Sequence, residues 1–164
     1  MVSGDIIIDT DDGKIIVDHV IANGTITTKT SDAGIHCSQV SCESMLAETS
    51  DDKVKLEEDT MKRKLNIESS YGGIVLNHVI APESLTVKTS DGDIIFERIQ
   101  SDDIELWDNY GNIKGSIEGK LADYSITSKT SSDYENSLPS SMDGGDKRLN
   151  VKTSDGKINV NFIQ

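Results

Sequence analysis

Residues 89–94 read Thr-Ser-Asp-Gly-Asp-Ile, and residues 153–158 read Thr-Ser-Asp-Gly-Lys-Ile. Related copies stand at residues 10–15, Thr-Asp-Asp-Gly-Lys-Ile, and at residues 30–35, Thr-Ser-Asp-Ala-Gly-Ile. The glycine position of this phrase falls at residues 13, 33, 52, 72, 92, 111, 133 and 156. A fixed period of about 20 residues is typical of stacked structural repeats, so the sequence predicts a solenoid.

Apolar residues alternate on both sides of each glycine position. In one repeat Leu85 and Val87 precede Gly92, and Ile94 and Phe96 follow it. Alternation with period two predicts two short strands per repeat, and no helical period persists. If each coil stacks on the previous one in parallel, at about 4.8 Å per rung, like residues form ladders. We therefore predict an all-β, single-stranded parallel β-helix or solenoid of about seven coils of 19–23 residues, wound right-handed.

The corner of the repeat and two irregular segments carry further expectations. Glycine suits a corner that needs a positive φ, and Asp52 and Asp133 tolerate the same region. Residues 57–64 lose the apolar pattern, because Asp59 takes an apolar position, and we expect a polar turn or one short helical turn there. Residues 134–146 have loop composition, and we expect them to fold over the C-terminal end as a partial cap.

Length and charge restrict the possible partners. One period throughout predicts a single domain over residues 1–164, the C-terminal part of a longer protein, because Ile6 and Ile8 already fill strand positions. The formal net charge of −13 argues against nucleic acid and anionic lipid, and leaves proteins, cationic peptides or cell-surface molecules as partners. This segment contains no signal peptide and no apolar stretch for membrane insertion. Cys37 and Cys42 are expected to be free thiols.

Stacking brings repeated polar residues together at the corner. One row is acidic and consists of Asp12, Asp32, Asp51 and Asp91. Its carboxylates either form turns through nearby backbone N–H groups or hold calcium, which would relieve their repulsion. We expect no cofactor and keep a calcium-binding solenoid as an alternative. A second row is expected to form a hydroxyl ladder that supports the turn, and consists of Thr30, Thr49, Thr89, Thr130 and Thr153.

Aromatic residues offer a candidate binding surface. Trp107 takes a position that holds Lys or Glu in other coils, and together with Tyr71 and Tyr110 it is expected to form a small exposed patch. Such a patch binds sugars, peptides or proteins, or it simply covers a coil edge. His19, His36 and His78 are expected at the surface, with His36 pointing outward.

Catalytic chemistry has no candidate in this chain. The sequence shows no compact Asp/Arg constellation, no Ser/His/Asp arrangement and no phosphate loop. We therefore expect a protein that is not an enzyme. A carbohydrate-binding or carbohydrate-active β-helix stays open as an alternative, although no residues can be nominated for catalysis.

The stretches 85–94 and 149–160 resemble the β-strand-repeat domain of bacterial adhesin-like proteins, a family of unknown function. The resemblance covers essentially the whole chain, and the loop ending in Leu138-Pro139 before the last coil also fits it. It implies a parallel β-solenoid that serves as a scaffold or interaction module of the bacterial cell envelope or cell surface. Asp59 and Gly115, which occupy core positions, depart from the regular pattern.

Overall fold

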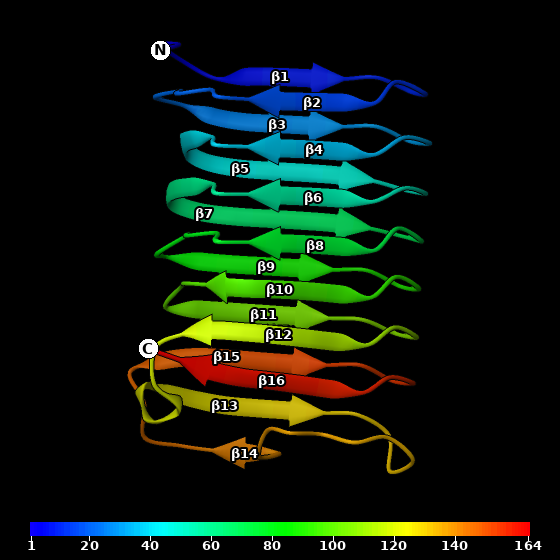
Figure 1. The fold of residues 1–164 in the computed structure, drawn as a ribbon, viewed down its shortest axis with the longest axis vertical. Helices are drawn as coiled ribbons and strands as arrows, with labels where there is room; N and C mark the ends of the chain where they lie inside the picture. The colour runs from blue at the N-terminus through cyan, green and yellow to red at the C-terminus, as the bar shows by residue number, and fades with distance from the viewer.

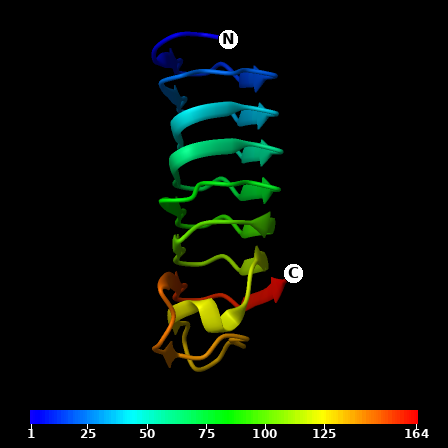
Figure 2. The ribbon, with the colours of Figure 1, turned by 90° about the vertical axis from the view of Figure 1, so that its left-hand side faces the viewer.

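The computed structural model describes all residues 1–164, and two parallel sheets face each other across a narrow apolar interior (Figures 1 and 2). The first sheet contains β1 (Ile6–Asp9), β3 (Thr25–Lys29), β5 (Ser41–Thr49), β7 (Thr60–Ser69), β9 (Ser84–Lys88), β11 (Asp103–Trp107), β13 (Tyr124–Lys129), β14 (Ser141–Met142) and β15 (Lys147–Lys152). The second contains β2 (Ile15–Asp18), β4 (Ile35–Ser38), β6 (Val54–Glu57), β8 (Ile74–Asn77), β10 (Ile94–Ile99), β12 (Ile113–Glu118) and β16 (Ile158–Ile163). The prediction of an all-β parallel solenoid of about seven coils is confirmed.

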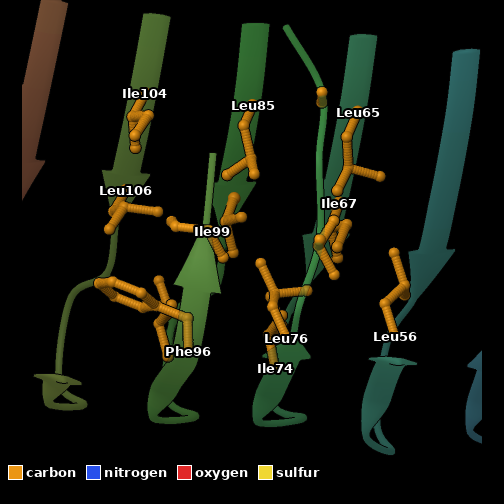
Figure 3. Close-up of a cluster of buried hydrophobic side chains, with 14 of the residues drawn as sticks. Leu56, Leu65, Ile67, Ile74, Leu76, Leu85, Phe96, Ile99, Ile104 and Leu106 are labelled. Carbon is orange, nitrogen blue, oxygen red and sulfur yellow. The ribbon is translucent and has the colours of Figure 1, made fainter. Parts of the chain in front are cut away.

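Equivalent positions of neighbouring coils lie directly over one another. Ile74 of β8 pairs with Val54 on one side and with Ile94 on the other. Figure 3 shows Leu56, Leu76 and Phe96 from successive strands pointing into the space between the sheets. The core contains 35 buried residues, and each buried aliphatic side chain contributes about 1.5–3 kcal/mol, so the thin interior holds the whole stack together.

Gly115 departs from the ladder for a steric reason. It follows Phe96 in the ladder, and a Cβ at Gly115 would meet the ring and the carbonyl of Phe96. The large ring therefore fills the space that the missing side chain leaves, as packing of large against small residues requires.

The corner glycines do not have the predicted positive φ. Outside the corners, Gly4, Gly119 and Gly144 have it. At the corners the coils approach so closely that a Cβ at Gly72 would collide with the carbonyl of Asp52, and one at Gly156 with that of Gly111. Glycine is needed there for the close approach of two backbones, and the expectation based on φ was wrong.

A positive φ does recur, but at the opposite end of the coil. It belongs to the residue six positions after the glycine position, at or just after the end of the second-sheet strand. These residues are His19, Gln39, Glu58, His78 and Arg98, with φ between 52° and 57°. None is glycine, so the tight stacking around them makes up for the intrinsic cost of this conformation.

The last coil is inserted into the stack and does not follow the order of the chain. β15 pairs with both β11 and β13, and β16 pairs with β12 (Figure 1). After β12 the chain turns at Gly119 and at the 3-10 helix η1 (Leu121–Asp123), and it places β13 one rung beyond β15. The expectation that each coil stacks on the previous one is therefore wrong here. β13 is not followed by a regular second strand, so only β16 provides β12 with a full partner.

Residues 130–146 cover the C-terminal end of the stack. Asn136 bridges to Ile158, and the Ser137 N–H donates to the Ile158 carbonyl at 2.9 Å. β14 pairs antiparallel with β13, and Leu138 is buried. Tyr124, fully buried, donates its hydroxyl to the Ser101 carbonyl at 2.9 Å. Residues 130–146 thus pair with part of the sheet edges that a bare parallel stack leaves open.

Residues 57–64 form no helical turn; the chain bends at Glu58 and continues as strand from Thr60. β6 ends at Glu57, β7 begins at Thr60, and Asp59 between them is fully buried. The Val40 N–H donates to Oδ1 of Asp59 at 2.7 Å, whereas Oδ2 has no partner. Burial raises the pKa of Asp59 to about 6, which means that the folded state resists its ionisation.

Replacing Gly72 by Ala tests the close approach at the corner. Because the new Cβ would collide with the Asp52 carbonyl, we expect Gly72→Ala to lower the free energy of unfolding by about 1–3 kcal/mol or more. Gly13→Ala is the matched control, since only the Thr10 side chain stands near its Cβ, and we expect a smaller loss. Equal losses in urea unfolding would contradict the steric role of the corner glycines.

Replacing Asp59 by Val tests the cost of the buried carboxyl. A pKa of about 6 in the folded state, above the usual 3.8, destabilises the fold once pH rises through this window. Asp59→Val should therefore stabilise the protein by about 1–3 kcal/mol at pH 8, after allowance for the lost Val40 hydrogen bond. The gain should shrink as pH falls from 6 through the usual pKa of 3.8, because Asp59 is protonated in both states only below that value. A gain in urea unfolding that does not change with pH would refute this account.

Candidate functional site

Backbone hydrogen bonds along the corner form a continuous ladder. One carbonyl of each coil accepts two N–H groups from the next coil: Ser31 accepts from Ser50 and Asp51, and Ser50 accepts from Ser70 and Tyr71. The Ser70 carbonyl accepts from the next coil in the same way. The corner is therefore rigid, and its backbone groups are occupied by the stacking itself.

The predicted hydroxyl ladder lies just inside this corner. The Thr49 hydroxyl donates to the Ala33 carbonyl at 2.9 Å, and the Thr89 hydroxyl to the Gly72 carbonyl at 3.2 Å. Thr153 and Thr130 donate in the same way to Gly111 and Gly156, which follows the inserted order of the last coils. These buried hydroxyls join each coil to its neighbour and fix the height of every rung.

A groove of about 390 Å³ runs along the corner across five coils, and we call it the serine groove. Its outer wall is formed by residues at or near the ends of strands of the first sheet, namely Lys29, Glu48, Glu68, Lys88 and Trp107. Its inner wall is formed by the corner residues Ser31, Ser50, Ser70 and Ser90, and its floor by Thr30, Thr49, Ser69 and Thr89. This groove is not among the predictions from the sequence, although a serine recurring two residues before the glycine position is a visible signal.

The charges of the outer wall cancel. Glu48 pairs in register with Lys29 and with Glu68, and Glu68 pairs with Lys88. Lys29 Nζ lies 3.4 Å from Glu48 Oε2. Two lysines flank two glutamates, so the groove carries no net formal charge although the protein carries −13.

The three predicted aromatic residues lie at one corner but not in one cluster. Trp107 closes the serine groove at one end. Tyr71 and Tyr110 are 64% and 63% exposed and belong to the neighbouring row, with Asp91 between them. The close ring pair of the structure lies elsewhere, between Tyr124 and Phe162, whose centroids are 5.4 Å apart.

The acidic row does not converge on one point. Asp12, Asp32, Asp51 and Asp91 are all exposed along the corner, and Tyr71 interrupts them. No group of three or more His, Cys, Asp or Glu side chains is arranged to hold a metal ion. The geometry therefore gives the calcium alternative no support.

Histidines and cysteines lie outside the serine groove. His19 and His78 are exposed or half-exposed, whereas His36 is half-buried and its Nε2 lies 3.0 Å from Glu57 Oε2. Cys37 and Cys42 are both buried free thiols. Burial raises the pKa of Cys37 to about 12 and that of Cys42 to about 11, so neither is a reactive thiolate at neutral pH.

A second hollow, of about 480 Å³, lies over the second sheet. Val75 and Ile95 line it with Glu97 and Lys114, next to Gly115. The register between β10 and β12 shifts here, after Phe96.

Asp108, next to Trp107, takes the position that Thr or Ser holds in the other coils. It is fully buried; its Oδ1 accepts the Asn109 N–H at 2.6 Å, and its Oδ2 has no partner. Burial raises the pKa of Asp108 to about 6. The nearby backbone N–H groups of Gly111, Asn109 and Tyr110 lower the pKa, but their effect is smaller than that of burial. The hydroxyl ladder is therefore interrupted where the groove ends.

Fold and corner together define a parallel β-solenoid with a polar groove along one edge. The Toastrack DUF4097 family model matches residues 3–161, so the chain belongs to this family, whose domain has no known function. No curated protein and no solved structure matches the chain significantly. The structure contains no helix of the length and apolar character needed to cross a membrane.

Replacing Asp108 by Thr should restore the ladder. A Thr hydroxyl at this position can donate to the Gly92 carbonyl, as Thr89 does to Gly72, and the buried charge disappears. We expect a gain of about 1–3 kcal/mol in the free energy of unfolding at pH 8, declining as pH falls from 6 to 4. Asp108→Val, which has the shape of Thr without the hydroxyl, separates the two effects. A Thr variant no more stable than the Val variant would rule out the restored hydrogen bond.

Proposed function

We propose that this chain is a non-enzymatic scaffold or interaction module of the bacterial cell envelope, and that it binds its partner along the serine groove. The observation that carries the proposal is the groove itself, which combines free side-chain hydroxyls, paired charges and an indole on a rigid support. Preorganised polar sites of this kind bind with little loss of conformational entropy.

The arrangement supports binding rather than turnover. The groove holds two Lys and two Glu side chains in one register row, with no His and no Cys among its lining residues. The buried carboxyls with raised pKa, Asp59 and Asp108, do not line it. Location at the envelope rests on the adhesin-like resemblance of the repeats and belongs to the proposal.

The test is co-sedimentation of the purified chain with envelope fractions of bacteria. We expect the wild type to be retained, and the triple variant Tyr71→Ala/Trp107→Ala/Tyr110→Ala to lose at least about fivefold in retention. All three side chains lie on the outside of the corner, so circular dichroism should show an unchanged fold. Tyr134→Ala, which removes an exposed tyrosine of the C-terminal segment, is the matched control and should be retained.

Two results would overturn the proposal. Failure of the wild type to bind any envelope fraction would reject an envelope partner, and full retention of the triple variant would reject this corner as the binding surface.

A further inference from the structure

We infer that the ligand of the serine groove is an extended, uncharged glycan chain. This inference rests on the proposed function and specifies the chemistry of its partner. It follows from three properties of the groove: which hydrogen-bonding groups are free, how its charges balance, and where its single aromatic ring lies.

The backbone of the groove has few free hydrogen-bonding groups for a ligand. Peptides that bind β-proteins by strand addition use free N–H and C=O groups at a sheet edge. Here the groove runs across the strands, and the carbonyls of Ser31, Ser50 and Ser70 each already accept two N–H groups from the next coil. An extended peptide could therefore not bind here by strand addition, which disfavours it as the occupant.

The side chains offer what a polyhydroxylated chain requires. The hydroxyls of Ser31, Ser50, Ser70 and Ser90 have no partner within the protein and recur about every 4.8 Å, once per rung. Glu48 and Glu68 on the opposite wall accept hydrogen bonds from hydroxyl groups. A chain of sugar rings has a repeat of similar length and presents hydroxyl groups along both edges, so successive rings can contact successive rungs.

The charge balance of the groove and the indole ring of Trp107 restrict the class of ligand further. Lys29 and Lys88 balance Glu48 and Glu68, so the groove favours neither an anionic nor a cationic polymer. Trp107 is the one apolar residue of the lining. The flat ring of Trp107 can stack on the C–H face of one sugar. This stacking places the end of the glycan at β11.

The experiment uses Trp107 as its own reporter, because it is the only tryptophan of the chain. Neutral hexasaccharides of β-linked glucose and of β-linked N-acetylglucosamine are titrated against the full chain, with a Gly/Ser hexapeptide and hexalysine in parallel. We expect a saturable shift of the fluorescence by at least one saccharide, protection from acrylamide quenching, and no effect of either peptide.

Matched serine variants test whether the saccharide binds in the serine groove. Ser50→Ala/Ser70→Ala removes two groove hydroxyls and should weaken saccharide binding about tenfold. Ser154→Ala removes the hydroxyl at the same corner position outside the groove and should leave binding unchanged. Calorimetry on Trp107→Ala, which cannot report by fluorescence, should show binding lost or strongly weakened.

The possible failures are distinct. If neither saccharide perturbs Trp107, or if both serine variants bind equally, the glycan inference is wrong. If a peptide alone binds with protection of Trp107, the groove takes a polypeptide and the inference is also wrong, while the proposed interaction module stands. Only the co-sedimentation experiment tests the proposed interaction module. Full retention of the Tyr71→Ala/Trp107→Ala/Tyr110→Ala variant would reject the corner as a binding surface for every class of ligand.

Discussion

In-register stacking of coils at about 4.8 Å per rung is the constraint on which the other features of this solenoid depend. Pairs such as Ile74 with Ile94 and Glu48 with Glu68 belong to the same register. A slip by one residue would turn every inward side chain outward, so the buried ladders hold the register strongly. The corner backbone ladder, the hydroxyl ladder and the serine groove are all consequences of that one repeat distance.

Close stacking explains the chemistry of the corner better than turn propensity does. Gly72 and Gly156 have no Cβ because the carbonyl of the neighbouring coil lies where it would be. The same closeness places the Thr49 and Thr89 hydroxyls within hydrogen-bonding distance of carbonyls one coil away. Stability thus comes from contacts between coils, as in other repeat proteins, and little of it arises within a coil.

Much of the architecture could be predicted from the sequence, because the apolar alternation directly shows which residues face inward. The order of the last coils could not. The phrase at residues 153–158 fits equally well on any coil, and no regular second strand follows β13, so that β16 takes the place beside β12. The corner glycines were misinterpreted because glycine serves both a positive φ and a close approach. The positive φ at His19 and its equivalents had no glycine to reveal it.

The candidate site was only partly visible for a related reason. Trp107 stands out in a row of Lys and Glu, but the groove beside it depends on how far the side chains of two rows stand apart. Sequence shows which positions repeat and does not show the space between them. The serine hydroxyls are therefore not among the candidates from the sequence, whereas in the structure they have no partner and line a hollow.

Four departures from the repeat fall in one coil, while Asp59 and Tyr71 depart from it elsewhere. The coil from β11 to β12 carries Trp107 in the charged row, Asp108 in the hydroxyl ladder, Tyr110 in the acidic row and Gly115 in the core. Asp108 costs stability, since it buries a carboxyl oxygen without a partner. Proteins tolerate such conflicts mainly where function requires them, although Asp59 shows that one buried carboxyl outside the groove is tolerated too. Trp107, Asp108 and Tyr110 lie at or beside the end of the serine groove, and their position is an argument for function that does not depend on the identity of the ligand.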